Sequence, residues 1–139
     1  ALLIAAVSHD IERAINGDWK AGSRDAQKLK KHQALYAKEV ENFLKLQKAD
    51  KNLIQRVSEL VSHHEKGGDR EQDILCSADA LTKFDPSAIR HANNYKKSAK
   101  TEQQMLDKCD YVWSRLKSEK ARELAKPMYD NAVKIIKKA

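Results

Sequence analysis

Apolar residues recur at helical spacing along most of the chain and predict seven helices. They are expected over residues 2–15, 29–47, 51–66, 70–84, 86–97, 102–116 and 119–135. Asp50 is expected to cap the third helix, and Thr101 with Gln104 forms a capping-box pattern before the sixth. Gly67 and Gly68 should end the third helix, and Pro127 should kink the last.

Length and composition agree with this helical interpretation. The chain has 139 residues, enough for one domain with a single core. Its 41% hydrophobic content is too high for a disordered protein, and 4 Gly and 2 Pro provide too few turns for an all-β fold. We therefore expect residues 1–139 to form an all-α, single-domain, multi-helix bundle.

The charge is basic but evenly spread. Lys and Arg number 27 against 20 for Asp and Glu, a formal net charge of +7, with a small excess in every third of the chain. Such a surface suits an anionic small molecule and allows weak nucleic-acid binding. Two small lysine clusters are the candidate nucleic-acid contacts: Lys28, Lys30 and Lys31, and Lys134, Lys137 and Lys138.

Two further features bear on the compartment. Cys76 and Cys109 lie in apolar helical patterns without CxxC spacing, so we interpret them as reduced core residues of a cytoplasmic protein. The apolar start, residues 1–7, is too short to span a membrane. We expect no membrane partner, and the composition says nothing about oligomeric state.

Histidine and aspartate residues fall on the expected apolar stripes of several helices. Burying an imidazole or carboxylate without a partner costs a few kcal/mol, and a lone buried histidine is usually satisfied by a hydrogen bond. Several together exceed routine packing and favour a metal site. Mixed imidazole and carboxylate ligands suit Mn, Fe, Co, Ni or Zn, with Mg less favoured. The candidates are His9, Asp10, His32, His63, His64 and Asp79.

These residues carry a resemblance to a known family. Residues 5–13, with the adjacent His9 and Asp10, resemble the His-Asp helix of the HD-domain superfamily of metal-dependent phosphohydrolases. Asp79, followed by Ala80-Leu81, matches the family's distal Asp. His32 falls where binuclear members carry their next His, and residues 63–65 resemble their paired His followed by Glu. Residues 113–125 are similar to the closing helices of small bacterial members.

The resemblance implies an all-helical HD-type fold that holds one or two divalent ions. The family's upstream His has no counterpart in the eight residues before His9, so we expect it to lie before Ala1. Glu12 stands where many relatives have Gly, which would alter the pocket rather than the metal. The Gly-Tyr-Pro signature of members that degrade cyclic-di-GMP is absent after residues 63–65, which argues against that substrate.

The expected activity is hydrolysis of a phosphate ester, a nucleotide or another small phosphorylated metabolite, by a metal-activated water. Asp10 would bridge two ions or accept a proton from the water, and Glu65 would orient an imidazole. Lys83 and Arg13 lie one turn beyond proposed ligands and would contact substrate phosphate. The alternative is a non-catalytic HD-fold binding or regulatory protein that contacts nucleic acid or a protein partner through its basic surface.

Overall fold

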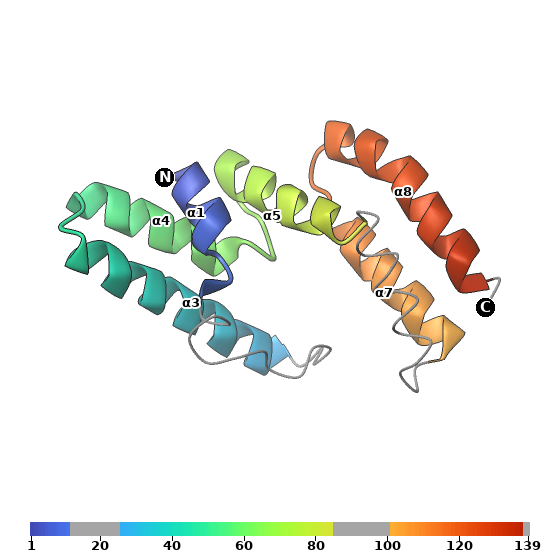
Figure 1. The fold of residues 1–139 in the computed structure, drawn as a ribbon, viewed down its shortest axis with the longest axis horizontal. Coiled ribbons are helices and arrows are strands. Elements are labelled where there is room, and N and C mark those ends of the chain that lie inside the picture. Colours follow the sequence, from blue (N-terminus) through green and yellow to red (C-terminus); the bar gives the residue numbers. More distant parts are fainter. Residues whose placement is uncertain (12–25, 85–100, 138–139) are drawn as a thin grey trace. The chain divides into compact units, whose positions relative to one another are not determined.

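The computed structural model describes residues 1–11, 26–84 and 101–137, with side chains from residue 33 onward in the second range. Within these ranges the protein contains six helices and no strand, which confirms the all-α expectation (Figure 1). The helices are α1 (Leu2–Ser8), α3 (Ala26–Leu46), α4 (Lys51–His63), α5 (Arg70–Thr82), α7 (Glu102–Ser114) and α8 (Glu119–Lys137).

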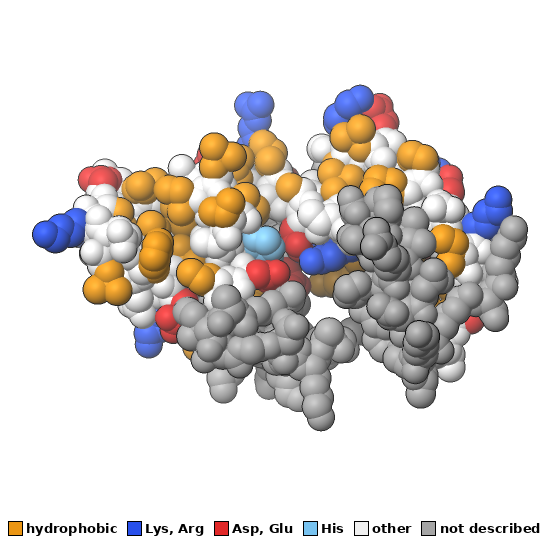
Figure 2. All heavy atoms as spheres, in the orientation of Figure 1, with side chains coloured by type: hydrophobic (Ala, Val, Ile, Leu, Met, Phe, Trp, Pro, Cys, Tyr) orange, Lys and Arg blue, Asp and Glu red, His pale blue; other side chains and the backbone are white. Residues whose placement is uncertain are grey.

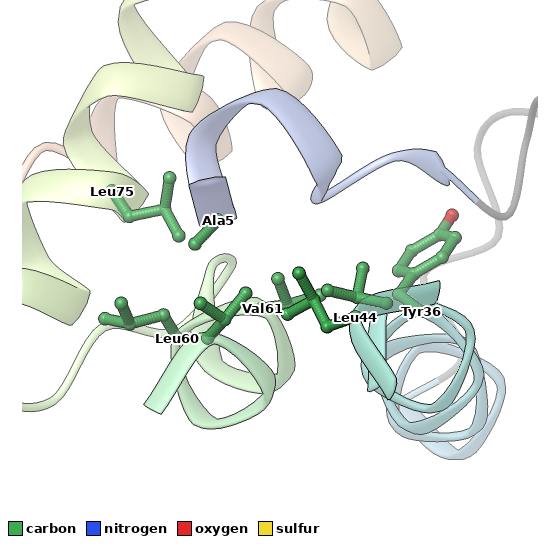
Figure 3. Packing of buried hydrophobic residues seen from close by; sticks show 8 residues of the cluster. Ala5, Tyr36, Leu44, Leu60, Val61 and Leu75 are labelled. Carbon is green, nitrogen blue, oxygen red and sulfur yellow. The ribbon is translucent and has the colours of Figure 1, made fainter. Parts of the chain in front are cut away.

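The chain forms two compact units, Ala1–Leu75 and Cys76–Ala139. In the first unit, α1, α3 and α4 pack together around one apolar cluster (Figure 3). Its centre is formed by side chains that are almost completely buried, Ala5, Tyr36, Val40, Leu44, Val57, Leu60, Val61 and Leu75. Leu75 comes from α5, so this helix contributes to the first core before the chain enters the second unit.

The second unit has its own core, formed by the end of α5, α7 and α8. The buried residues are Ala80, Phe84, Val112, Leu116, Ala121 and Ala125. Two further aromatic rings pack against this core: Trp113 and Tyr129 have centroids 4.8 Å apart, and Phe84 meets both edge to face. The Tyr129 hydroxyl donates a hydrogen bond to Asp110 at 2.6 Å and joins α8 to α7.

The expected start and stop signals of the central helices are confirmed. The Asp50 side chain accepts hydrogen bonds from the backbone amides of Asn52 and Leu53 in the first turn of α4, and Thr101 and Gln104 form the reciprocal capping box of α7. Gly67 adopts φ +74°, the left-handed conformation that a helix end favours. Pro127 lies inside α8 and does not end it. The expected helix over residues 86–97 lies outside the described residues.

The first helix differs from its expected length. α1 ends at Ser8 instead of continuing toward residue 15, so His9 and Asp10 lie in a turn, and Ile11 is helical again. The Nδ1 atom of His9 binds the carbonyl of Ala6, the acceptor that the Asp10 amide would need in a continuous α-helix. This side-chain competition gives a local reason for the break.

The expected apolar stripe of the first helix is also wrong in part. Leu3 and Val7 are 83% and 88% exposed, whereas Ala5 is the buried residue of α1. Helical spacing predicted that Leu3 and Val7 face the core. A short helix can instead bury a small residue, here Ala5, where it crosses another helix closely. Apolar side chains are correspondingly visible over this part of the surface in Figure 2. No described helix has both the length and the apolar character needed to cross a membrane.

An ionic cluster holds the connection between α4 and α5. Arg56 donates to Glu71 at 2.7 Å and to Asp69 at 3.1 Å, so one guanidinium joins α4 to the start of α5. These contacts raise the pKa of Arg56 and, chiefly through the hydrogen bond from Arg56, lower the pKa of Asp69 to about 2. The cluster fixes the segment that follows the paired histidines.

Candidate functional site

Two of the predicted histidines meet in the first unit. His9 follows α1, and His64 caps the C-terminal end of α4. Their ring centroids are 5.1 Å apart, and the Tyr36 ring of α3 lies 5.9 Å from that of His64. The two imidazoles therefore come from segments far apart in the sequence, as a bundle-interior site requires. We call these two rings the imidazole pair.

Both rings of the imidazole pair are held through the same nitrogen. His9 Nδ1 lies 2.9 Å from the carbonyl oxygen of Ala6, and His64 Nδ1 lies 2.6 Å from that of Val61. A carbonyl oxygen only accepts, so Nδ1 carries the proton in both rings. In the neutral imidazole the lone pair is then on Nε2, which is the tautomer of a metal ligand or general base.

A carboxylate lies near each Nε2 atom. Asp10 Oδ2 is 3.6 Å from His9 Nε2, and Glu65 Oε1 is 3.8 Å from His64 Nε2. Glu65 was expected to orient an imidazole through the nitrogen away from the metal. The carbonyl of Val61 occupies that position, and Glu65 lies instead on the Nε2 side. The imidazole pair with Asp10 and Glu65 forms what we call the His–carboxylate cluster.

His63 occupies a different position from its neighbour. Its side chain is exposed, and Nδ1 lies 2.9 Å from the Ser62 hydroxyl and 2.9 Å from the Glu59 carbonyl of its own helix. His64, by contrast, is only 2% exposed. The structure thus separates the two adjacent histidines, although His63 as a ligand stays a prediction.

The donor chemistry of the His–carboxylate cluster suits a divalent transition metal, because it combines imidazole nitrogen with carboxylate oxygen. The donor atoms of this cluster do not by themselves form a complete metal site. Across the described side chains, no three His, Cys, Asp or Glu residues converge as a metal-binding group. His32, the predicted further ligand, and Arg13, a predicted phosphate contact, lie outside the described side chains.

Asp79, the predicted distal ligand, lies in the second unit and contacts two cations there. Arg115 Nη2 donates to Asp79 Oδ2 at 2.6 Å, and Lys83 Nζ lies 3.2 Å from Oδ1. Asp79 and Arg115 are both buried, whereas Lys83 is half-exposed. Asp79 as a metal ligand stays a prediction.

Arg115 is the residue of this site that the sequence did not reveal. It begins the turn between α7 and α8, where a basic residue is usually solvated. Two further bonds attach that turn to α5: the Cys76 thiol contacts the Arg115 carbonyl at 3.4 Å, and the Lys117 amide donates to the Ser77 hydroxyl at 2.9 Å. Burial raises the pKa of the Cys76 thiol, so it stays protonated and unreactive.

Comparisons with known proteins bring no further assignment. No protein-family model, no curated protein and no solved structure matches the chain.

Proposed function

We propose that this protein is a metal-dependent phosphohydrolase that acts on a small phosphate ester such as a nucleotide, with His9, Asp10 and His64 among its metal ligands. The observation that carries the proposal is the imidazole pair, whose rings are 5.1 Å apart and whose Nδ1 atoms both bind backbone carbonyls. This arrangement places the proton of each neutral ring on Nδ1 and brings a carboxylate within 4 Å of each Nε2 atom, at 3.6 Å for His9 and 3.8 Å for His64. The resemblance to the HD-domain superfamily supports the same reaction class.

A bound divalent ion would supply a water of lowered pKa and a positive charge for the phosphoryl oxygens. Asp10 and Glu65 are the carboxylates close enough to the Nε2 side to accept the proton of that water. His32 and His63 are proposed as ligands of a second ion. Asp79 is proposed as the distal ligand, with Arg115 as its buried counter-ion.

Lys83 is the proposed contact to the substrate phosphate in the described part of the chain. Its side chain is 41% exposed and shares Asp79 with Arg115, so its ammonium group is available to a ligand that approaches from solvent. Arg13 is proposed for the same role from the sequence.

The test combines a panel of phosphate esters with Mn, Fe, Co, Ni and Zn, added separately to the chelator-treated protein. We expect hydrolysis only after metal addition, and its loss in Asp10→Asn, which keeps the shape of the side chain and removes its charge. Lys66→Gln, a change at an exposed residue, is the matched control. Hydrolysis that survives in Asp10→Asn, or its absence with every metal, would end the proposal.

The second candidate function is a non-catalytic protein that keeps the helical fold and binds a protein partner. The exposed Leu3 and Val7 favour it, because they stand one turn apart on α1. Retained metal with no hydrolysis of any ester would favour this function over the first.

A further inference from the structure

The amide group of Gln33 is buried without a hydrogen-bond partner. The side chain is only 4% exposed, and in the described part of the chain its Nε2 atom is shielded from solvent and donates to no acceptor. A buried donor without an acceptor lowers stability, so native proteins keep few of them. Such a group is retained where a ligand, an ion or a bound water completes it.

The position of Gln33 relates it to the His–carboxylate cluster. Gln33 lies one turn before Tyr36 on the buried face of α3, and residues three apart on a helix are neighbours. The Tyr36 ring is 5.9 Å from that of His64. Figure 3 shows α1 running from Ala5 toward Tyr36, so the end of α1 that leads to His9 approaches this part of α3.

In the described part of the chain, Gln33 Nε2 donates to no acceptor of the cluster, neither to the Asp10 carboxylate nor to that of Glu65. Nδ1 of each imidazole is protonated, and in the proposed function the Nε2 lone pairs belong to the metal. A phosphate ester brings several acceptor oxygens, and an uncharged amide can bind one without adding charge beside Asp10 and Glu65.

We propose that the Gln33 amide is a substrate-positioning donor that hydrogen-bonds a phosphoryl oxygen of the ligand held at the His–carboxylate cluster. The inference rests on the proposed function for the class of ligand. It assigns Gln33 to orientation of the phosphoryl group and gives it no part in bond cleavage.

The experiment titrates inorganic phosphate into the full chain, with and without Mn²⁺, and follows the heat of binding. Gln33→Met keeps the length of the side chain and removes the donor, and Gln33→Leu is a second donor-free variant. Ser58→Ala is the matched control, because it removes another buried, unpartnered polar atom of the same unit. A helical serine hydroxyl can turn to a carbonyl of its own helix, which the Gln33 amide does not do here.

We expect the wild type to bind phosphate and Gln33→Met to bind it roughly 3- to 10-fold more weakly, as for loss of one neutral hydrogen bond. KM for hydrolysis should rise by a similar factor with little change in kcat. The melting temperature of the metal-free variant should equal or exceed that of the wild type, because the unpaired donor is gone. Ser58→Ala should bind phosphate as the wild type does.

Phosphate binding within twofold of wild type in both donor-free variants overturns the inference, and so does a wild type that binds no phosphate. Metal content and hydrolysis, measured on the same samples, report separately on the proposed function. Phosphate binding that depends on Gln33 without metal or hydrolysis would end the proposed function and keep this assignment. Metal-dependent hydrolysis with an unchanged KM in Gln33→Met would keep the proposed function and end the assignment of Gln33.

Discussion

At the scale of single residues, the sequence predicted burial better than partnership. Helical spacing placed His64 on the apolar stripe of its helix, and His64 is buried. His63 was expected in the bundle interior as well, but its side chain is exposed. The same reasoning did not find Arg115, because its partner Asp79 is 36 positions away and periodicity describes one helix at a time. Long-range ion pairs leave no local signal in a single sequence.

The first prediction concerns the buried ion pair of Asp79 and Arg115. Asp79→Ala leaves a buried guanidinium without its carboxylate, and loss of one partner in such a pair costs about 3–5 kcal/mol. Urea unfolding should show this loss. Asp79→Leu combined with Arg115→Met should recover most of it, because apolar replacements of similar volume are tolerated. Unchanged stability in Asp79→Ala would contradict the role of the pair.

The second prediction concerns Lys83, whose ammonium group contacts the same Asp79 carboxylate. Its ion pair with Asp79 is half-exposed, so Lys83→Ala should cost less than about 1 kcal/mol of stability. If Lys83 contacts the substrate phosphate, the same change should lower kcat/KM roughly 10- to 150-fold, as for a charge-assisted hydrogen bond, with metal content unchanged. A kcat/KM within twofold of wild type for every hydrolysed ester makes Lys83 a solvated surface charge.

At the scale of helices, the ends governed by capping residues were predictable and the end of α1 was not. Asp50, Thr101 and the Gly67-Gly68 pair carry signals that act on their own neighbours, so the sequence located these ends. α1 ends where the His9 ring takes the carbonyl of Ala6, a competition that propensity and periodicity do not represent. The resulting turn places the imidazole of His9 beside that of His64.

The hydrogen bond between α7 and α8 leads to a prediction about how the stability of the protein depends on pH. The hydrogen bond to Asp110 raises the pKa of Tyr129 to about 12 from an ordinary value of 10. A raised folded-state pKa means that this bond contributes its full stability below about pH 10 and loses it as the pH rises toward 12. The contribution is about 1 kcal/mol or less, because the group is largely solvated.

The measurement is urea unfolding of wild type and Tyr129→Phe at several pH values. The difference in unfolding free energy should be constant from pH 7 to about pH 9.5 and should shrink above pH 10. The comparison with Tyr129→Phe cancels the titration of lysines common to both proteins. A difference that grows with pH would contradict the bond between α7 and α8.

At the scale of the whole molecule, the sequence predicted the fold class but not the division into two compact units. Helix periodicity shows which residues face inward and not which helices share a core. α5 illustrates this limit, since Leu75 belongs to the first core and Ala80 to the second. Whether the two units behave as the expected single domain therefore depends on whether they unfold together.

We expect one unfolding transition. Each unit, Ala1–Leu75 and Cys76–Ala139, is close to the size below which a single core supplies only a few kcal/mol. Because α5 runs through the boundary, unfolding of either unit should remove part of the helix on which the other depends. Differential scanning calorimetry should give equal calorimetric and van't Hoff enthalpies. Two resolved transitions would show that the units are independent domains.

The central claim is that the imidazole pair binds a metal ion, and elemental analysis tests it most directly. Chelator-treated protein would be loaded with Mn, Fe, Co, Ni or Zn, desalted and measured, beside His64→Gln and the exposed control variant Lys66→Gln. We predict at least one ion per wild-type chain and a loss of about tenfold or more in affinity in His64→Gln, with a folded circular dichroism spectrum. Fewer than about 0.2 ions per wild-type chain with every metal, or equal metal in wild type and folded His64→Gln, would contradict the claim.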